Sequence, residues 1–193
     1  MIKTLLNKAR DVRAIYRWKK AGKPFPPPHA IKRKVVKEYG KGLNTLIETG
    51  TYLGDMVEAM RKDFEKVYSI ELSRELFLKA QKRFDNSPNV TILQGDSGEI
   101  LETIVRDLKA PALFWLDGHY SAGFTAKGNK ETPIVEELKT IADSKLPHVV
   151  LIDDARCFTG EQDYPTMEEL EKLSASLGFT GFAVENDIIR LQK

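Results

Sequence analysis

The stretch LIETGTYLGD, residues 46–55, decides the fold. It begins as an apolar run, passes through an acid, and carries the spacing Glu48-x-Gly50-x-x-x-Gly54 just before a helical pattern. The first glycine allows close backbone approach, and the second allows a tight passage from strand to helix. The spacing differs from the Gly-x-Gly-x-x-Gly pattern of dinucleotide-binding loops. It indicates a ligand-binding loop at the carboxyl end of a first parallel strand.

Short apolar runs alternate with helical patterns after this stretch, which is typical of βαβ units. We expect strands at residues 44–49, 66–71, 90–94, 112–117 and 148–153, and helices at 54–63, 73–84, 97–107, 132–142 and 164–177. Two last strands, 179–184 and 188–191, flank a short polar connection suited to a hairpin, so one of them runs antiparallel. The sequence predicts an α/β, Rossmann-like three-layer sandwich with a seven-stranded, mostly parallel sheet and a C-terminal antiparallel hairpin.

A basic segment precedes this α/β region. Residues 1–42 hold 13 Lys and Arg against two acids, whereas residues 43–193 hold 17 against 26. Apolar residues recur at helical spacing through the first 20 residues, and a Pro-rich connection separates them from a second basic helix at residues 29–39. We therefore expect a basic N-terminal helical arm with a Pro-rich linker over residues 1–42 and an α/β domain over residues 43–193.

Composition narrows the protein class. No apolar run approaches the roughly 20 residues that a membrane span requires, and the first ten residues lack the apolar core of a signal peptide. A single cysteine, Cys157, excludes an intrachain disulfide and cannot form a cysteine-rich zinc site alone. We expect a cytoplasmic protein.

Acidic residues also end the second and third predicted strands. Glu71 lies 21 positions beyond Gly50, where such folds place a carboxylate that accepts hydrogen bonds from ribose hydroxyls. Asp96 either contacts an adenine ring or caps the next helix, and the two roles are compatible. The residues predicted to bind a nucleoside cofactor are Glu48, Thr49, Gly50, Thr51, Tyr52, Gly54, Asp55, Glu71, Leu72, Gly95, Asp96, Ser97 and Asp117.

With these acids in order at the strand ends, residues 43–193 resemble class I S-adenosylmethionine-dependent methyltransferases. The loop Glu-Thr-Gly-Thr-Tyr-x-Gly is similar to that of the macrocin O-methyltransferase group, although Tyr52 stands where a middle glycine is usual. The resemblance implies an S-adenosyl-L-methionine-binding enzyme domain over 43–193. It also implies O-methylation of a small hydroxylated acceptor, such as a sugar or another natural product.

Three further carboxylates follow the fourth and fifth strands. Asp117, Asp153 and Asp154 should converge at one sheet edge, where a hard cation such as Mg²⁺ would relieve their repulsion. Alternatively, the acidic pair caps the next segment and Asp117 accepts backbone hydrogen bonds. Catechol- and macrocin-type metal-dependent O-methyltransferases resemble the chain here, which implies that all three acids are metal ligands and that Asp117 takes part in catalysis.

His119, two positions after Asp117, is the candidate general base, because an ordinary imidazole exchanges protons near neutral pH. A lone histidine is otherwise structural or surface-exposed. The long polar segment 120–133 that follows suits a lid over the acceptor, or else a surface insertion.

Two other function classes remain open at this point. The basic arm could neutralise phosphates, which suggests a nucleic-acid methyltransferase. The sequence Asp-Gly-His-Tyr after the fourth strand argues against it, because amine methylation of bases uses an Asn/Asp-Pro-Pro-Tyr type of motif. The chain could also be a non-catalytic nucleoside-binding or assembly module. For the arm, we expect packing over the active site or in a homo-oligomer interface in preference to peripheral membrane contact.

Overall fold

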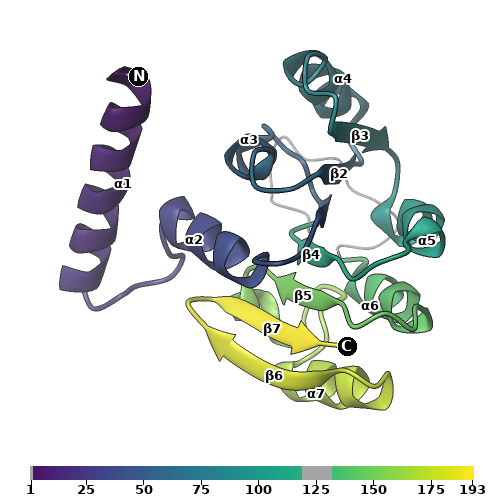
Figure 1. Cartoon of the computed structure of the whole chain (residues 1–193). Helices are drawn as coiled ribbons and strands as arrows, with labels where there is room; N and C mark the ends of the chain where they lie inside the picture. Colours follow the sequence, from purple (N-terminus) through teal and green to yellow (C-terminus); the bar gives the residue numbers. More distant parts are fainter. Residues whose placement is uncertain (1, 119–131) are drawn as a thin grey trace.

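The computed structural model describes residues 2–118 and 132–193. One seven-stranded sheet runs through the molecule, in the order β3-β2-β1-β4-β5-β7-β6 (Figure 1). The strands are β1 (Thr45–Thr49), β2 (Lys66–Glu71), β3 (Val90–Gln94), β4 (Leu113–Leu116), β5 (Val149–Ile152), β6 (Thr180–Glu185) and β7 (Ile188–Gln192). The helices are α1 (Ile2–Lys20), α2 (His29–Tyr39), α3 (Asp55–Met60), α4 (Arg74–Arg83), α5 (Ser97–Asp107), α6 (Ile134–Asp143) and α7 (Met167–Ser176), with a short 3₁₀ turn η1 (Ala155–Cys157).

The predicted sheet is confirmed. Strands β1 to β5 pair in parallel, while β7 pairs antiparallel with both β5 and β6. The closing hairpin is tighter than predicted, because Glu185 still belongs to β6 and only Asn186 and Asp187 form the turn. Both have positive φ angles, 55° and 62°, which is the backbone of a type I′ turn and matches the twist of the flanking strands.

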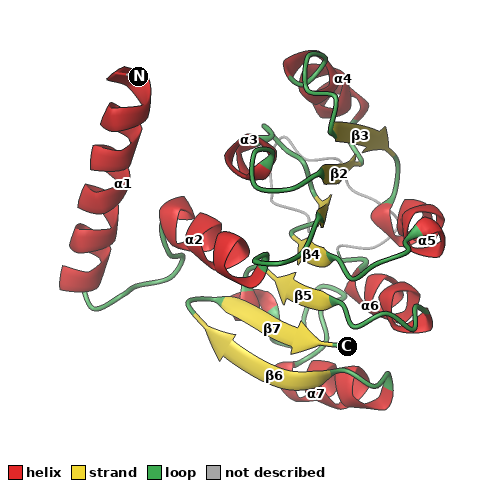
Figure 2. Cartoon of the chain, in the orientation of Figure 1, coloured by secondary structure: helices red, strands yellow, loops and turns green. Residues whose placement is uncertain are grey.

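Helices cover both faces of the sheet, as Figure 2 shows with helices in red and strands in yellow. Successive β1 residues point to opposite faces: Ile47 joins a core with α5, α6 and α7, and Leu46 joins a second core with α2 and α3. Both side chains are fully buried. This arrangement confirms the three-layer sandwich, and it places the carboxyl ends of β1, β2, β4 and β5 along one edge.

The two N-terminal helices differ in how they meet the sheet. Helix α2 lies against it and buries Val35 and Val36 in the second core. Helix α1 stands outside the α/β body and adjoins α2 (Figure 1). Among the described residues, no helix combines the length and hydropathy needed to span a membrane.

Candidate functional site

The glycine loop after β1 packs directly on the end of β4. Gly50 has φ +85°, and a Cβ atom built on it would lie 2.3 Å from the carbonyl oxygen of Asp117. The Asp117 backbone N–H donates to the Thr49 carbonyl at 3.0 Å. Gly50 is therefore required by the approach of two protein segments, in addition to any ligand. This contact joins the predicted cofactor loop to the predicted reacting centre.

Glu71 at the end of β2 holds the same loop from the other side. One carboxylate oxygen accepts from the Tyr52 backbone N–H at 2.7 Å, and the other accepts from the Ser73 backbone N–H at 2.9 Å. Burial raises the pKa of Glu71, and these two hydrogen bonds oppose the rise. A carboxylate offers about four lone-pair sites, so Glu71 keeps acceptor capacity for two ribose hydroxyls.

Glu48 lies beneath the loop, where it is almost fully buried. Its carboxyl group accepts a short hydrogen bond from the Ser69 hydroxyl, which lies 2.6 Å from the Thr51 hydroxyl. Burial raises the pKa of Glu48 to about 8, in spite of the Ser69 hydrogen bond. Glu48 therefore carries a proton at neutral pH and supports the loop from inside through Ser69 and Thr51.

The proton on Glu48 predicts a pH-dependent stability. Between the unfolded pKa, ordinarily 4.5, and the folded pKa of about 8, only the folded state holds this proton. The contribution of this proton to the free energy of unfolding is therefore fully present below pH 4.5. It declines as pH rises toward 8, by about 1.4 kcal/mol per pH unit. Glu48→Gln should remove this contribution. We expect its melting temperature to exceed that of the wild type at pH 8.5 and to match it near pH 5, measured by thermal unfolding.

The exposed Glu99, on α5, offers a matched amide substitution as a control. Other groups titrate in the same pH range, so the quantity to compare is the difference between each variant and the wild type. A Glu48→Gln variant whose stability runs parallel to that of the wild type from pH 5 to 8.5 would show that Glu48 is ionised in the folded protein.

The remaining predicted cofactor residues differ in where the structure places them. Asp96 caps α5, accepting from the Gly98 backbone N–H at 2.9 Å, so the capping role is present and the adenine role stays a prediction. Asp55 instead lies on the surface and pairs with Arg83 at 2.9 Å. The other residues lie at the carboxyl ends of β1, β2 and β3: Thr49 ends β1, Gly54, Leu72 and Gly95 lie in the loops, and Ser97 begins α5.

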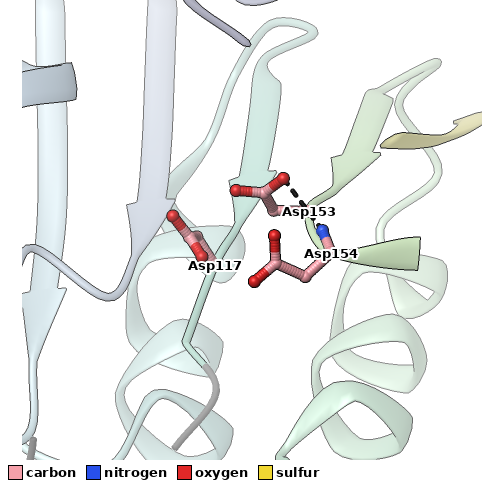
Figure 3. A group of neighbouring side chains, drawn as sticks. All are labelled: Asp117, Asp153 and Asp154. Carbon is pink, nitrogen blue, oxygen red and sulfur yellow. Dashed lines mark hydrogen bonds between the residues drawn. The ribbon is translucent and has the colours of Figure 1, made fainter. Parts of the chain in front are cut away.

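Three carboxylates gather at the ends of β4 and β5, as predicted. Asp117, Asp153 and Asp154 each offer an oxygen atom, and these atoms lie within 4.8 Å of one another (Figure 3). Asp154 adopts a left-handed backbone, φ 55°, and donates its N–H to an Asp153 oxygen at 2.8 Å. That turn brings the second acid of the pair back toward the first. We call these three residues the acidic cluster.

A lysine from the N-terminal arm reaches the acidic cluster. The ammonium group of Lys32, on α2, makes a short ion pair with Asp153 and bonds an Asp154 oxygen at 3.0 Å. Burial acts to lower the pKa of Lys32, but Asp153, Asp154 and Asp117 together outweigh it, so the pKa lies above its ordinary value. Lys32 is therefore a cation built into the site, which the prediction from charge convergence did not include.

Burial and the neighbouring charges both shift the pKa values of the acidic cluster. Burial raises the pKa of Asp153 to about 6, in spite of the pairing with Lys32. Burial, with Asp153 as the next cause, raises the pKa of Asp117 well above its ordinary value, and Lys32 opposes the rise. Arg156 bonds the same Asp154 oxygen as Lys32, at 2.8 Å, and also pairs with the buried Asp187 of the hairpin turn. Arginine and lysine thus both neutralise the β5 acids.

Two buried charged residues were not among the predicted site residues. Lys32 falls in the helical stripe of Ile31, Val35 and Val36, and a lysine on an apolar helix face was the available signal. Glu137, on α6, is 2 % exposed, and burial raises its pKa to about 7. Glu136 precedes it in the chain, and nothing in the sequence indicated which of the two glutamates is buried. His119 and residues 120–131 of the predicted lid lie outside the described residues.

Comparisons with known proteins bear on the fold. No protein-family model matches the chain. One curated relative, the ribosomal RNA small subunit methyltransferase A of Acidobacterium capsulatum, is 33 % identical over 92 residues. That alignment covers 46 % of this chain and 32 % of the relative, so the chain matches about a third of the relative's length.

Solved structures match over a greater length. The SAH-bound methyltransferase PaMTH1 of Podospora anserina superposes with a TM-score of 0.57 and 18 % identity, over 92 % of this chain and 86 % of PaMTH1. The human N-acetylserotonin methyltransferase in complex with SAM gives a TM-score of 0.52 and 13 % identity, over 84 % of this chain and 51 % of the human protein. Together with the sheet order and the closing hairpin, these matches show that the chain has the Rossmann-like fold of class I S-adenosylmethionine-dependent methyltransferases.

Proposed function

We propose that the chain is an S-adenosylmethionine-dependent methyltransferase. The observation that carries this proposal is the contact between Gly50 and the backbone of Asp117, which sets a loop suited to the cofactor against the acidic cluster. Methyl transfer from a sulfonium is an in-line displacement, so donor and acceptor sites must adjoin. The fold and the curated relative support the same reaction.

The proposed cofactor site uses the strand ends in order. The Glu71 carboxylate would accept from the ribose hydroxyls, and Asp96 would face the adenine ring while it caps α5. Gly50 and the backbone of Thr51 would line the methionine part, because both donate to Ile70 of β2 while Gly50 packs against Asp117 at the end of β4. In this assignment Glu48 supports the loop and does not touch the cofactor.

For the acceptor, we propose a small hydroxylated molecule, such as a sugar, and transfer to its oxygen. A hydroxyl group must lose its proton as the methyl group arrives, and a carboxylate or an imidazole within hydrogen-bond reach can take it. Asp117 stands beside the glycine loop with a raised pKa, and His119 follows two positions later in the chain. The acidic cluster would therefore orient the hydroxyl and receive its proton.

Mg²⁺ fits the donor chemistry of the acidic cluster, since three carboxylate oxygens lie within 4.8 Å of one another. Asp117, Asp153 and Asp154 would hold it, and the cation would lower the pKa of a coordinated hydroxyl. The ammonium of Lys32 already bonds two of these acids. We therefore propose that Lys32 and the divalent cation are alternative counter-ions, and that metal binding displaces the lysine.

Lys32→Met tests this competition without an activity assay. In EDTA the variant should lose stability, by about 3 kcal/mol or more, because the buried Asp153 loses its counter-ion, whereas Asp154 keeps Arg156. Mn²⁺, which takes the same oxygen ligands as Mg²⁺, should restore the stability and bind at least about tenfold more tightly than to the wild type. Calorimetry and thermal unfolding with and without Mn²⁺ give both readouts.

Lys37→Met is the matched control, since Lys37 lies on the same helix but pairs with Asp63 at the surface. Lys32→Arg keeps the charge if the methionine variant does not fold. Equal Mn²⁺ affinity in the wild type and Lys32→Met would contradict the competition. If neither protein binds Mn²⁺, the metal part of the proposal fails and Lys32 is the permanent counter-ion.

A second candidate is methylation of ribosomal RNA. The curated relative carries that description, and the arm supplies cations for a phosphate backbone. The end of β4 disfavours it, since Asp117-Gly118 lacks the prolines of the Asn/Asp-Pro-Pro-Tyr type of motif that amine methylation of bases uses. A transfer assay with labelled S-adenosylmethionine decides between sugars and phenols on one side and ribosomal RNA on the other.

Binding of S-adenosylhomocysteine, measured by calorimetry, is the first experiment. We expect a dissociation constant in the micromolar range, as for typical enzyme ligands. Absence of nucleoside binding would overturn the whole proposal. Binding without transfer to any acceptor class would instead favour a nucleoside-binding or assembly module.

A further inference from the structure

Helix α1 presents an outward face that the fold leaves uncovered. Val12 and Tyr16 are 68 % and 65 % exposed, and Phe25, in the linker that follows, is 62 % exposed. In residues 9–118 and 132–193, only seven large apolar side chains are exposed, and these are three of them. Val12 and Tyr16 are four positions apart and so share one side of the helix.

A row of cations runs beside this apolar pair. Arg13, Arg17 and Lys20 are exposed and follow the same helical spacing, so they border Val12 and Tyr16 along the helix. The acid of the helix, Asp11, is on another side, where Arg33 of α2 binds it at 2.7 Å. The outward face therefore carries an apolar stripe with positive charge next to it and no acid.

Contacts on the inner side keep this face outward. Trp18 is buried, and its indole N–H donates to the Pro24 carbonyl at 2.7 Å. Together with the Arg33–Asp11 pair, this bond ties α1 to the linker and to α2. The uncovered face thus belongs to a helix that is held in place.

We propose that α1 binds the surface of an anionic lipid bilayer. Exposed aliphatic and aromatic side chains insert at the boundary of head groups and acyl chains, while neighbouring arginines and lysines pair with lipid phosphates. The charge distribution suits this orientation, because residues 1–42 are strongly basic and the α/β body is acidic. An anionic surface would attract the arm and repel the body.

Two other occupants fit the face less well. A nucleic acid would use the arginines but has no counterpart for an exposed valine. A second copy of the chain in a two-fold contact would place Arg13, Arg17 and Lys20 against the same residues of its partner, which repel one another. The combination of apolar and cationic rows favours the bilayer.

Vesicle binding by the full chain tests the proposal. We expect co-sedimentation with vesicles of phosphatidylcholine and phosphatidylglycerol, none with phosphatidylcholine alone, and release as salt rises from about 0.1 M to about 1 M. Arg13→Gln with Arg17→Gln should weaken binding about tenfold or more, and so should Val12→Ser with Tyr16→Ser. Lys62→Gln with Lys109→Gln, an equal loss of charge on exposed parts of the body, should leave binding unchanged.

Three results would overturn it. The first is the absence of binding to the anionic vesicles. The second is binding that falls in the arginine variant but not in the Val12/Tyr16 variant, which would indicate a hydrated polyanion such as a nucleic acid. The third is a dimer, seen by light scattering, that the Val12/Tyr16 variant converts to monomer. Thermal unfolding and S-adenosylhomocysteine binding should be the same for all variants, so failure here is distinguishable from failure of the proposed methyltransferase function.

Discussion

Replacing Asp117 by asparagine should reduce methyl transfer by at least about a hundredfold and leave the affinity for S-adenosylhomocysteine within a few-fold of the wild type. Asparagine has the same shape but no negative charge, so it cannot take a proton or bind a cation strongly. The variant should also fold, because it removes one of three acids that burial and mutual repulsion already disfavour. Calorimetry with S-adenosylhomocysteine and a labelled-methyl assay separate the two effects.

Asp107→Asn, at the exposed end of α5, is the control for the same chemical change away from the site. Both the cofactor role and the reacting role were predicted for Asp117, and this experiment distinguishes them. A parallel loss of cofactor affinity and transfer would assign Asp117 to the cofactor. Full activity of the asparagine variant would remove Asp117 from the reaction.

Gly50→Ala should abolish cofactor binding and destabilise the fold, by roughly 3 kcal/mol or more in total. About 1 to 2 kcal/mol comes from the positive φ, and the rest comes from a methyl group forced to within 2.3 Å of the Asp117 carbonyl oxygen. To relieve this overlap the glycine loop must move away from β4, which separates the cofactor site from the acidic cluster. Urea unfolding and calorimetry measure the two losses.

Gly42→Ala provides the matched control. Gly42 has nearly the same backbone angle, φ +83°, but a Cβ atom there would meet nothing within 4 Å. It should therefore cost only the conformational part, about 1 to 2 kcal/mol, and leave cofactor binding intact. Equal costs at the two positions would show that the loop and β4 can separate without consequence, and would remove the observation on which the proposed function depends.

The sequence predicted the sheet well because its signals are local. Parallel strands that are buried on both faces read as short apolar runs, and the acids directly after them mark the carboxyl ends. The closing hairpin was predictable for the same reason, since Asn186 and Asp187 tolerate the left-handed backbone of a tight turn. The convergence of Asp117, Asp153 and Asp154 followed from the expectation that β4 and β5 are neighbours.

The counter-ion of the acidic cluster was not predictable in that way. Lys32 precedes Asp153 by 121 positions. The residues next to each of them in the chain give no signal that the two side chains form an ion pair. The repulsion expected among three neighbouring carboxylates indicated only that a cation should lie near them. Whether an ammonium group or a metal ion supplies it depends on where α2 packs against the sheet.

By itself, the sequence determined the order of strands and helices, the glycine loop and the acids at the strand ends, because each depends on residues within a few positions of one another. Only the tertiary structure decided that Glu48 is a buried, protonated support, that Gly50 faces a carbonyl group, and that Lys32 enters the acidic cluster. Those properties depend on burial and on contacts between distant segments. Hydropathy and spacing along one segment do not encode them.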